Sequence, residues 1–77
     1  MIKAKFFGLL KDYMPETDSS GFFEVKEEMT ISELLEKTGA VSENVGMTLL
    51  VNRVRKHGDY VLKDGDVLTV MPLLAGG

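Results

Sequence analysis

One segment near the middle of the chain constrains the fold more than any other, because it carries both a start signal and a stop signal for a helix. Thr30 and Glu33 have the S/T-x-x-E spacing of a capping box. In that motif the Thr30 hydroxyl accepts a hydrogen bond from the Glu33 amide, and the Glu33 carboxylate accepts one from the Thr30 amide. Gly39 supplies a left-handed stop. The sequence therefore predicts one short amphipathic helix over residues 31–38.

Alternation of inward and outward side chains predicts strands on both sides of this helix. The predicted strands are residues 2–7 and 22–25 before the helix, separated by a helical turn at 9–14 and a polar loop at 15–21, and residues 49–51, 54–56 and 67–71 after it. Turns are expected at Asn52-Arg53 and at residues 63–66. This order requires an α+β fold, a mixed sheet of four to five strands with the helix across one face. A right-handed crossover would set the last strand parallel to the first, as in ubiquitin-like proteins.

Length, charge and residue usage exclude several classes of function. The 77 residues suffice for one small domain, placed at residues 1–72, with a flexible tail over residues 73–77. A net charge of -3 gives no cationic field to attract nucleic acid. There is no cysteine, and the single histidine, His57, lacks suitably spaced partners, so we expect a surface histidine and no metal site. Without a signal peptide or a run of ~20 apolar residues, we expect a cytoplasmic protein with no membrane partner.

The end of the sequence carries the strongest functional signal. After Pro72 the chain reads Leu73-Leu74-Ala75-Gly76-Gly77. Glycines have no side chain, so such a tail can thread a narrow slot and bring its α-carboxylate to a reactive centre in another protein. We assign tail threading to Ala75 and Gly76, and the reactive carboxylate to Gly77. A frayed end made of small residues is the alternative interpretation.

Alternation along the first and last strands predicts a docking patch beside this tail. It assigns Phe6 and Val70 to the core and leaves Phe7 and Met71 as exposed apolar residues on neighbouring strands. The predicted partner-binding residues are Phe7, Met71, Pro72, Leu73 and Leu74. If the assignment slipped by one residue, Phe7 and Met71 would instead belong to the core.

Several stretches together resemble the MoaD/ThiS family of ubiquitin-like sulfur carriers. They are Met1-Ile2-Lys3 with Phe6-Phe7, Thr30-x-x-Glu33-Leu34, Val51-Asn52, Leu62-Lys63-Asp64-Gly65-Asp66, and the end Met71-Pro72-Leu73-Leu74-Ala75-Gly76-Gly77. The resemblance covers essentially the whole chain and implies a β-grasp fold. It also implies that a ubiquitin-activating-type adenylyltransferase uses ATP to adenylate Gly77, which becomes a thiocarboxylate and donates sulfur. The chain itself would have neither an active site nor a bound cofactor.

The tail most resembles that of MoaD, the small subunit of molybdopterin synthase. This resemblance implies that the large subunit of the synthase, acting on the molybdopterin precursor, receives the sulfur. Three alternatives stay open. The chain can be a ThiS-like carrier for thiamine thiazole synthesis, a ubiquitin-like modifier of other proteins, or a β-grasp binding module with no chemistry at its C-terminus.

Overall fold

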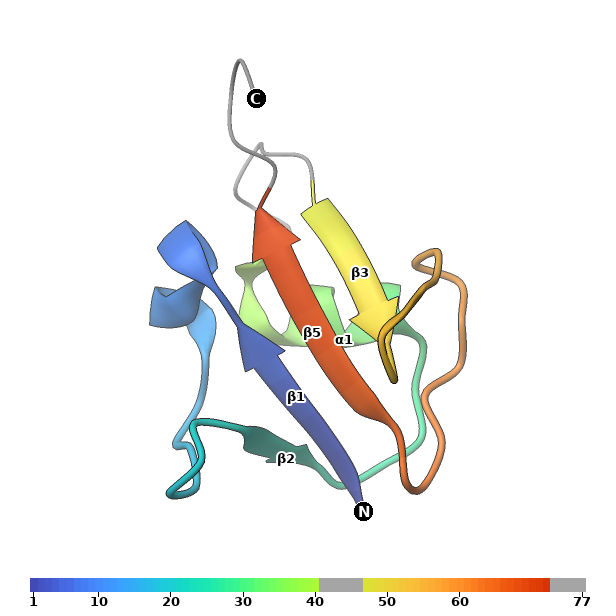
Figure 1. Cartoon of the computed structure of the whole chain (residues 1–77), viewed down its shortest axis with the longest axis horizontal. Coiled ribbons are helices and arrows are strands. Elements are labelled where there is room, and N and C mark those ends of the chain that lie inside the picture. The colour runs from blue at the N-terminus through green and yellow to red at the C-terminus, as the bar shows by residue number, and fades with distance from the viewer. Residues whose placement is uncertain (41–46, 73–77) are drawn as a thin grey trace.

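The computed structural model describes residues 1–40 and 47–72. Within these ranges the chain forms one mixed five-stranded sheet, and one α-helix crosses a single face of that sheet (Figure 1). The elements in chain order are β1 (Ile2–Phe6), the 3-10 helix η1 (Gly8–Tyr13), β2 (Phe23–Val25), α1 (Ile31–Thr38), β3 (Met47–Val51), β4 (Val54–Arg55) and β5 (Val67–Pro72). The predicted α+β, β-grasp architecture is confirmed.

The strand order β2-β1-β5-β3-β4 places the last strand of the chain at the centre of the sheet. β5 runs parallel to β1, with Phe6 opposite Val70, and antiparallel to β3, with Val51 opposite Leu68. The predicted parallel pairing of the first and last strands is therefore confirmed. The two edges are formed by the shortest strands, since β2 has 3 residues and β4 has 2.

Several strand boundaries differ from the prediction. β1 ends at Phe6, one residue earlier than predicted, and the differences in β2 and β5 have identifiable causes. The Phe22 amide donates to Asp18 Oδ1 at 3.1 Å, and its carbonyl accepts from the Asp18 amide at 2.7 Å. Because the loop uses these backbone groups, β2 begins at Phe23 and not at Phe22. β5 extends through Pro72, which pairs with Met47 of β3. Proline has no amide hydrogen to donate to a neighbouring strand, and β5 ends with it.

A two-residue turn joins β3 to β4. Asn52 and Arg53 have φ values of 52° and 69°, as expected for the centre of a type I′ turn. The predicted turn is thus confirmed. β3 begins earlier than predicted, at Met47, and β4 ends at Arg55.

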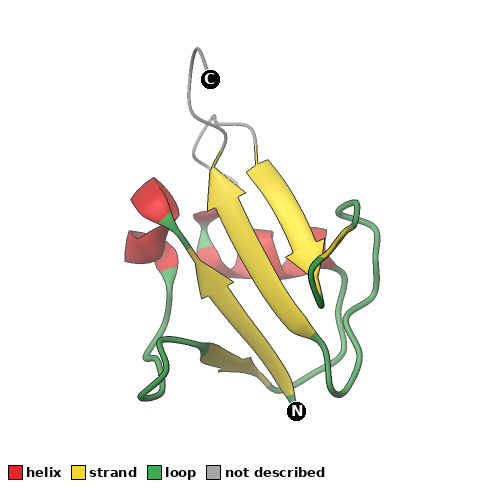
Figure 2. Cartoon of the chain, viewed as in Figure 1, coloured by secondary structure: helices red, strands yellow, loops and turns green. Residues whose placement is uncertain are grey.

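The hydrophobic core lies between the sheet and α1, which runs behind the strands in Figure 2. The core side chains of these elements are Ile2, Ala4, Phe6, Phe23, Val25, Val51, Leu68 and Val70 from the sheet and Ile31, Leu34 and Leu35 from the helix. The rings of Phe6 and Phe23 meet edge to face with their centroids 5.2 Å apart. That geometry suits the quadrupoles of two aromatic rings and ties β2 to the centre of the core.

The start of α1 satisfies its free amides in two ways. The capping box forms as predicted, since the Glu33 amide donates to Thr30 Oγ1 at 3.1 Å and the Thr30 amide donates to Glu33 Oε1 at 2.9 Å. The amides of Ile31 and Ser32 donate to carbonyls of the loop that precedes β5. This second anchor is tight, because a Cβ added at Gly58 would lie 2.3 Å from Ser32 Oγ. The helix is therefore fixed to the sheet through its first turn.

A buried carboxylate ties together the loops at the start of β5. Asp66 is 8% exposed, and it accepts from Asn52 Nδ2 at 3.0 Å, from the Tyr60 hydroxyl at 3.1 Å and from the Lys63 amide at 2.9 Å. Burial alone raises the pKa of Asp66, but these three donors outweigh it and hold the pKa below the usual value of 3.8. For Tyr60, burial and the bond to Asp66 together raise the pKa.

The cap at Thr30 yields a prediction about stability. Thr30→Ala removes the acceptor for the Glu33 amide and should lower the free energy of unfolding by about 0.5–2 kcal/mol. Thr30→Ser keeps the acceptor and serves as the matched control. Denaturant midpoints at constant slope measure the difference. An alanine variant as stable as wild type would show that the cap contributes nothing.

The Asp66 cluster yields a prediction about pH. Its folded pKa is depressed, so its contribution to stability is present above about pH 3.8 and is lost as the pH falls through the folded pKa. Asp66→Asn should destabilise the chain by about 1–3 kcal/mol near neutral pH, because a donor replaces an acceptor. Denaturation of both proteins from about pH 7 to about pH 3 should show this gap narrowing. A difference in stability between wild type and Asp66→Asn that does not change with pH would contradict a lowered pKa for Asp66.

Candidate functional site: the carboxyl end of β5

The expected tail leaves the domain from the carboxyl end of the central strand. Pro72, the last residue of β5, pairs on one side with Met47 of β3. In Figure 1, η1 lies beside the same end of the sheet. The predicted tail residues Leu73, Leu74, Ala75, Gly76 and Gly77 lie outside the described residues, and their roles stay predictions.

The other side of Pro72 is held by a glycine whose role sequence analysis did not detect. Gly8 has a φ of +61°, and a Cβ added there would lie 2.9 Å from Pro72 Cγ. Just before it, the Phe7 amide donates to the Val70 carbonyl at 2.9 Å. Any larger residue at position 8 would need both an unfavourable backbone conformation and a shift of the proline ring. Gly8 therefore fixes the point from which the tail departs, and a glycine directly after a strand was its only sequence signal.

The predicted faces of β1 and β5 are confirmed around this point. Phe6 and Val70 are 0% exposed, whereas Phe7 is 37% exposed. Met71 is half-buried and so less exposed than predicted. It belongs to the central strand, with Thr48 of β3 opposite it on one side and the end of β1 on the other. Phe7 directly follows β1, and Met71 and Pro72 end the neighbouring strand β5. We call these three residues the docking patch, and their role in binding a partner stays a prediction.

A lysine is held between two aromatic rings beside the docking patch. Lys5 Nζ lies 5.2 Å from the centroid of the Phe7 ring and 5.3 Å from the centroid of the Phe22 ring. These distances are within the range in which a cation is attracted to the face of a ring. The neighbouring lysine differs, because Lys3 Nζ forms an ion pair with Asp18 Oδ2 at 3.6 Å. Hydrogen bonding from the Phe22 amide lowers the pKa of Asp18, so this carboxylate is charged at neutral pH.

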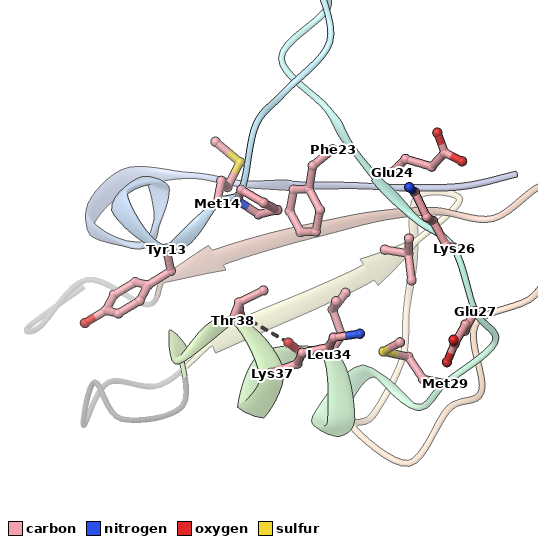
Figure 3. A pocket seen from close by; sticks show the side chains of 12 residues that line it. Tyr13, Met14, Phe23, Glu24, Lys26, Glu27, Met29, Leu34, Lys37 and Thr38 are labelled. Atoms are coloured by element: carbon pink, nitrogen blue, oxygen red, sulfur yellow. Dashed lines mark hydrogen bonds between the residues drawn. The ribbon is translucent and has the colours of Figure 1, made fainter.

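A groove of about 460 Å³ lies elsewhere, between β2 and α1. Figure 3 shows Phe23 on one side of it, Leu34 and Thr38 of the helix on the other, and Met29 near one end. Lys26 and Lys37 on its rim are matched by Glu24 and Glu27, so its charges favour neither sign of ligand. None of its lining residues belongs to β5 or to the docking patch. The groove is therefore separate from the candidate site.

The described part of the chain offers neither a cluster of metal ligands nor a helix able to span a membrane. Residues 1–40 and 47–72 contain no cluster of three or more histidine or acidic side chains arranged to hold a metal ion. Over the same ranges, no helix has the length and apolar character needed to cross a membrane. His57 is exposed, as predicted, and so are Glu24, Glu27 and Glu28.

Comparison of the sequence with known protein families identifies a family for this chain. The sequence model of the ThiS family matches residues 5–77, which includes β5, the docking patch and the tail. The chain belongs to the ThiS family. A search of curated proteins gave no match. Membership of this family agrees with a small carrier whose chemistry is performed by other proteins.

Solved structures with the same fold support the architecture. One is a Pyrococcus furiosus protein provisionally assigned as subunit 1 of the molybdopterin converting factor, at 24% identity and a TM-score of 0.63, with 95% of this chain and 97% of that chain covered. Another is SAMP1 from Haloferax volcanii, at 18% identity and a TM-score of 0.61, with 99% and 98% covered. At these identities the likeness shows the shared fold, over nearly the full length of each protein.

Proposed function

We propose that this ThiS-family chain is a sulfur carrier whose reactive group is the α-carboxylate of Gly77. A ubiquitin-activating-type adenylyltransferase would join this carboxylate to the α-phosphate of ATP and release pyrophosphate. A sulfide equivalent then displaces AMP and leaves a C-terminal thiocarboxylate, which donates its sulfur to an acceptor. The observation that carries the proposal is the family match, which runs through the Gly-Gly end at residue 77.

The fixed base of the tail supports this proposal. Pro72 lies between Met47 and Gly8, so the tail begins at a defined point on a packed sheet. Five extended residues span at most about 17–18 Å, at roughly 3.3–3.6 Å each. This reach allows Gly77 to enter the active site of a partner while the domain stays outside it. The chain then needs no catalytic group or cofactor of its own, and ATP is consumed by the partner.

The expected acceptor is the molybdopterin precursor, bound by the large subunit of molybdopterin synthase. The tail after Pro72 and the assignment of the Pyrococcus furiosus relative both favour this pathway. The second candidate is thiamine thiazole synthesis, which the name of the matching family favours. Reconstitution of sulfur transfer with each acceptor enzyme separately would distinguish the two. We expect either reaction to take place in the cytoplasm.

The chemistry at Gly77 predicts a strict requirement for the position of the last carbonyl carbon. Deleting Gly77, or adding one residue after it, should abolish adenylation while leaving the unfolding temperature unchanged. Pyrophosphate release measures adenylation. Intact mass should first show that wild type ends at Gly77, and should then show a gain of about 16 Da as sulfur replaces oxygen. Normal adenylation of the extended chain, with no trimming detected by mass, would contradict the proposal.

The docking patch predicts that stability and binding respond to different residues. Phe7→Ala and Met71→Ala should weaken binding to the activating enzyme or to the synthase large subunit, with losses of about 2 kcal/mol if Phe7 is a central anchor. Their inward neighbours serve as controls, because Phe6→Ala should cost about 3–5 kcal/mol of stability and Val70→Ala should also destabilise the fold. Calorimetry and binding titrations on the four variants test this. If Phe7→Ala lost as much unfolding free energy as Phe6→Ala, Phe7 would belong to the core and not to the docking patch.

A further inference from the structure

We propose that Lys5 is a preformed cation site that binds a carboxylate on the activating enzyme and sets the orientation in which the docking patch meets that enzyme. The inference rests on the proposed function and adds the chemistry of the partner surface. Three observations carry it: the way Lys5 is held, its lack of a counter-charge, and the charge of the face on which it lies.

Lys5 is held by contacts around the end of its side chain. The rings of Phe7 and Phe22 lie 5.2 Å and 5.3 Å from its ammonium nitrogen. Beneath it, a Cβ added at Gly21 would lie 3.4 Å from Lys5 Nζ and 3.5 Å from Lys5 Cε, so the side chain passes close over the glycine backbone. The side chain is half-buried. A lysine with so little freedom loses less side-chain entropy when a ligand binds it.

This ammonium group has no anionic partner in the part of the chain that the structure describes. Lys3, on the same face of β1, is paired with Asp18, whereas the contacts of Lys5 are with aromatic rings. Aromatic rings attract a cation through their faces but do not occupy its three N–H donors with conventional hydrogen bonds. A carboxylate arriving from outside would therefore find a partly desolvated and unpaired donor.

The face that carries Lys5 selects for an acidic partner. Strand register and alternation give the outward residues as Glu24 on β2, Lys3 and Lys5 on β1, Val67, Thr69 and Met71 on β5, Thr48 and Leu50 on β3, and Arg55 on β4. Three of these strand residues are cationic and one is acidic, and Asp18 adds a second acidic group in its ion pair with Lys3. The face thus keeps a small positive excess, although the whole chain has a net charge of -3. An uncharged strip on β5 and β3 thus lies between Lys5 on β1 and Arg55 on β4. The complementary surface carries acidic groups opposite these two cations.

Because of where Lys5 lies, a carboxylate bound to it would help to set the orientation of the domain on the activating enzyme. Its ammonium group lies against the Phe7 ring, and Phe7 belongs to the docking patch at the base of the tail. A carboxylate bound there would be fixed beside the point where Pro72 releases the chain. One apolar contact and one charged contact together determine how the domain is turned, whereas an apolar patch alone does not.

The test uses three single variants and the purified activating enzyme from the same genome. Lys5→Met keeps the apolar stem and removes the charge, while Lys5→Arg keeps the charge. Lys37→Met makes the same change in charge on α1, which lies across the other face of the sheet. Affinity is titrated at low and high salt, below the unfolding temperature of each variant. Adenylation of Gly77 is measured in parallel.

Lys5→Met should weaken binding at low salt by at least about tenfold and should reduce its dependence on salt. Lys37→Met should bind within about threefold of wild type, and Lys5→Arg should bind more tightly than Lys5→Met because it keeps the charge at a site where the two cations are not fully interchangeable. Equal losses for Lys5→Met and Lys37→Met would show an effect of net charge alone and would overturn the proposal. Wild-type affinity of Lys5→Met would do the same and leave the proposed function standing. A wild-type chain that is neither bound nor adenylated would overturn the proposed function, and the assignment of Lys5 with it.

Discussion

The parallel pairing of β1 with β5 is the contact on which the rest of this structure depends. β5 lies between β1 and β3 in the sheet. The sheet is therefore continuous only when this last strand of the sequence is paired with both of them. The inward residues of β5, Leu68 and Val70, are fully buried in the core that this pairing closes. Pro72, from which the predicted tail would extend, therefore belongs to a strand that is paired on both sides. Local opening of an edge strand, β2 or β4, would leave β5 and Pro72 in place.

Sequence reasoning predicted α1 correctly because the signals for that helix are local. Thr30, Glu33 and Gly39 lie within a single short segment, and each acts on backbone groups a few residues away. The errors in strand boundaries arose where a distant or competing partner decides the outcome. Asp18 takes the backbone groups of Phe22 into a loop, and Met47 extends β5 to Pro72. Neither pairing leaves a periodic pattern in the sequence.

In the candidate site too, features set by neighbouring residues were predictable and contacts between distant residues were not. Alternation alone predicted that Phe6 and Val70 would be buried and that Phe7 would face outward, because the period of a strand relates neighbours directly. It could not reveal that Gly8 receives the Pro72 ring, since those residues meet only through the parallel pairing of β1 and β5. It also missed the position of Lys5, because Phe22 approaches that side chain from the loop before β2. Which strand residues face outward was thus predictable from alternation, whereas which distant residues meet could be seen only in the fold.

The shortness of the two edge strands has a consequence for how this protein behaves at high concentration. With 3 residues in β2 and 2 in β4, neither edge offers a long ladder of free backbone groups to a second molecule. Both edges also carry charge, through Glu24 and Arg55. Such features oppose the stacking of sheets into fibres. Copies of this chain should therefore stay dispersed at high concentration, because their short and charged edges disfavour pairing between molecules.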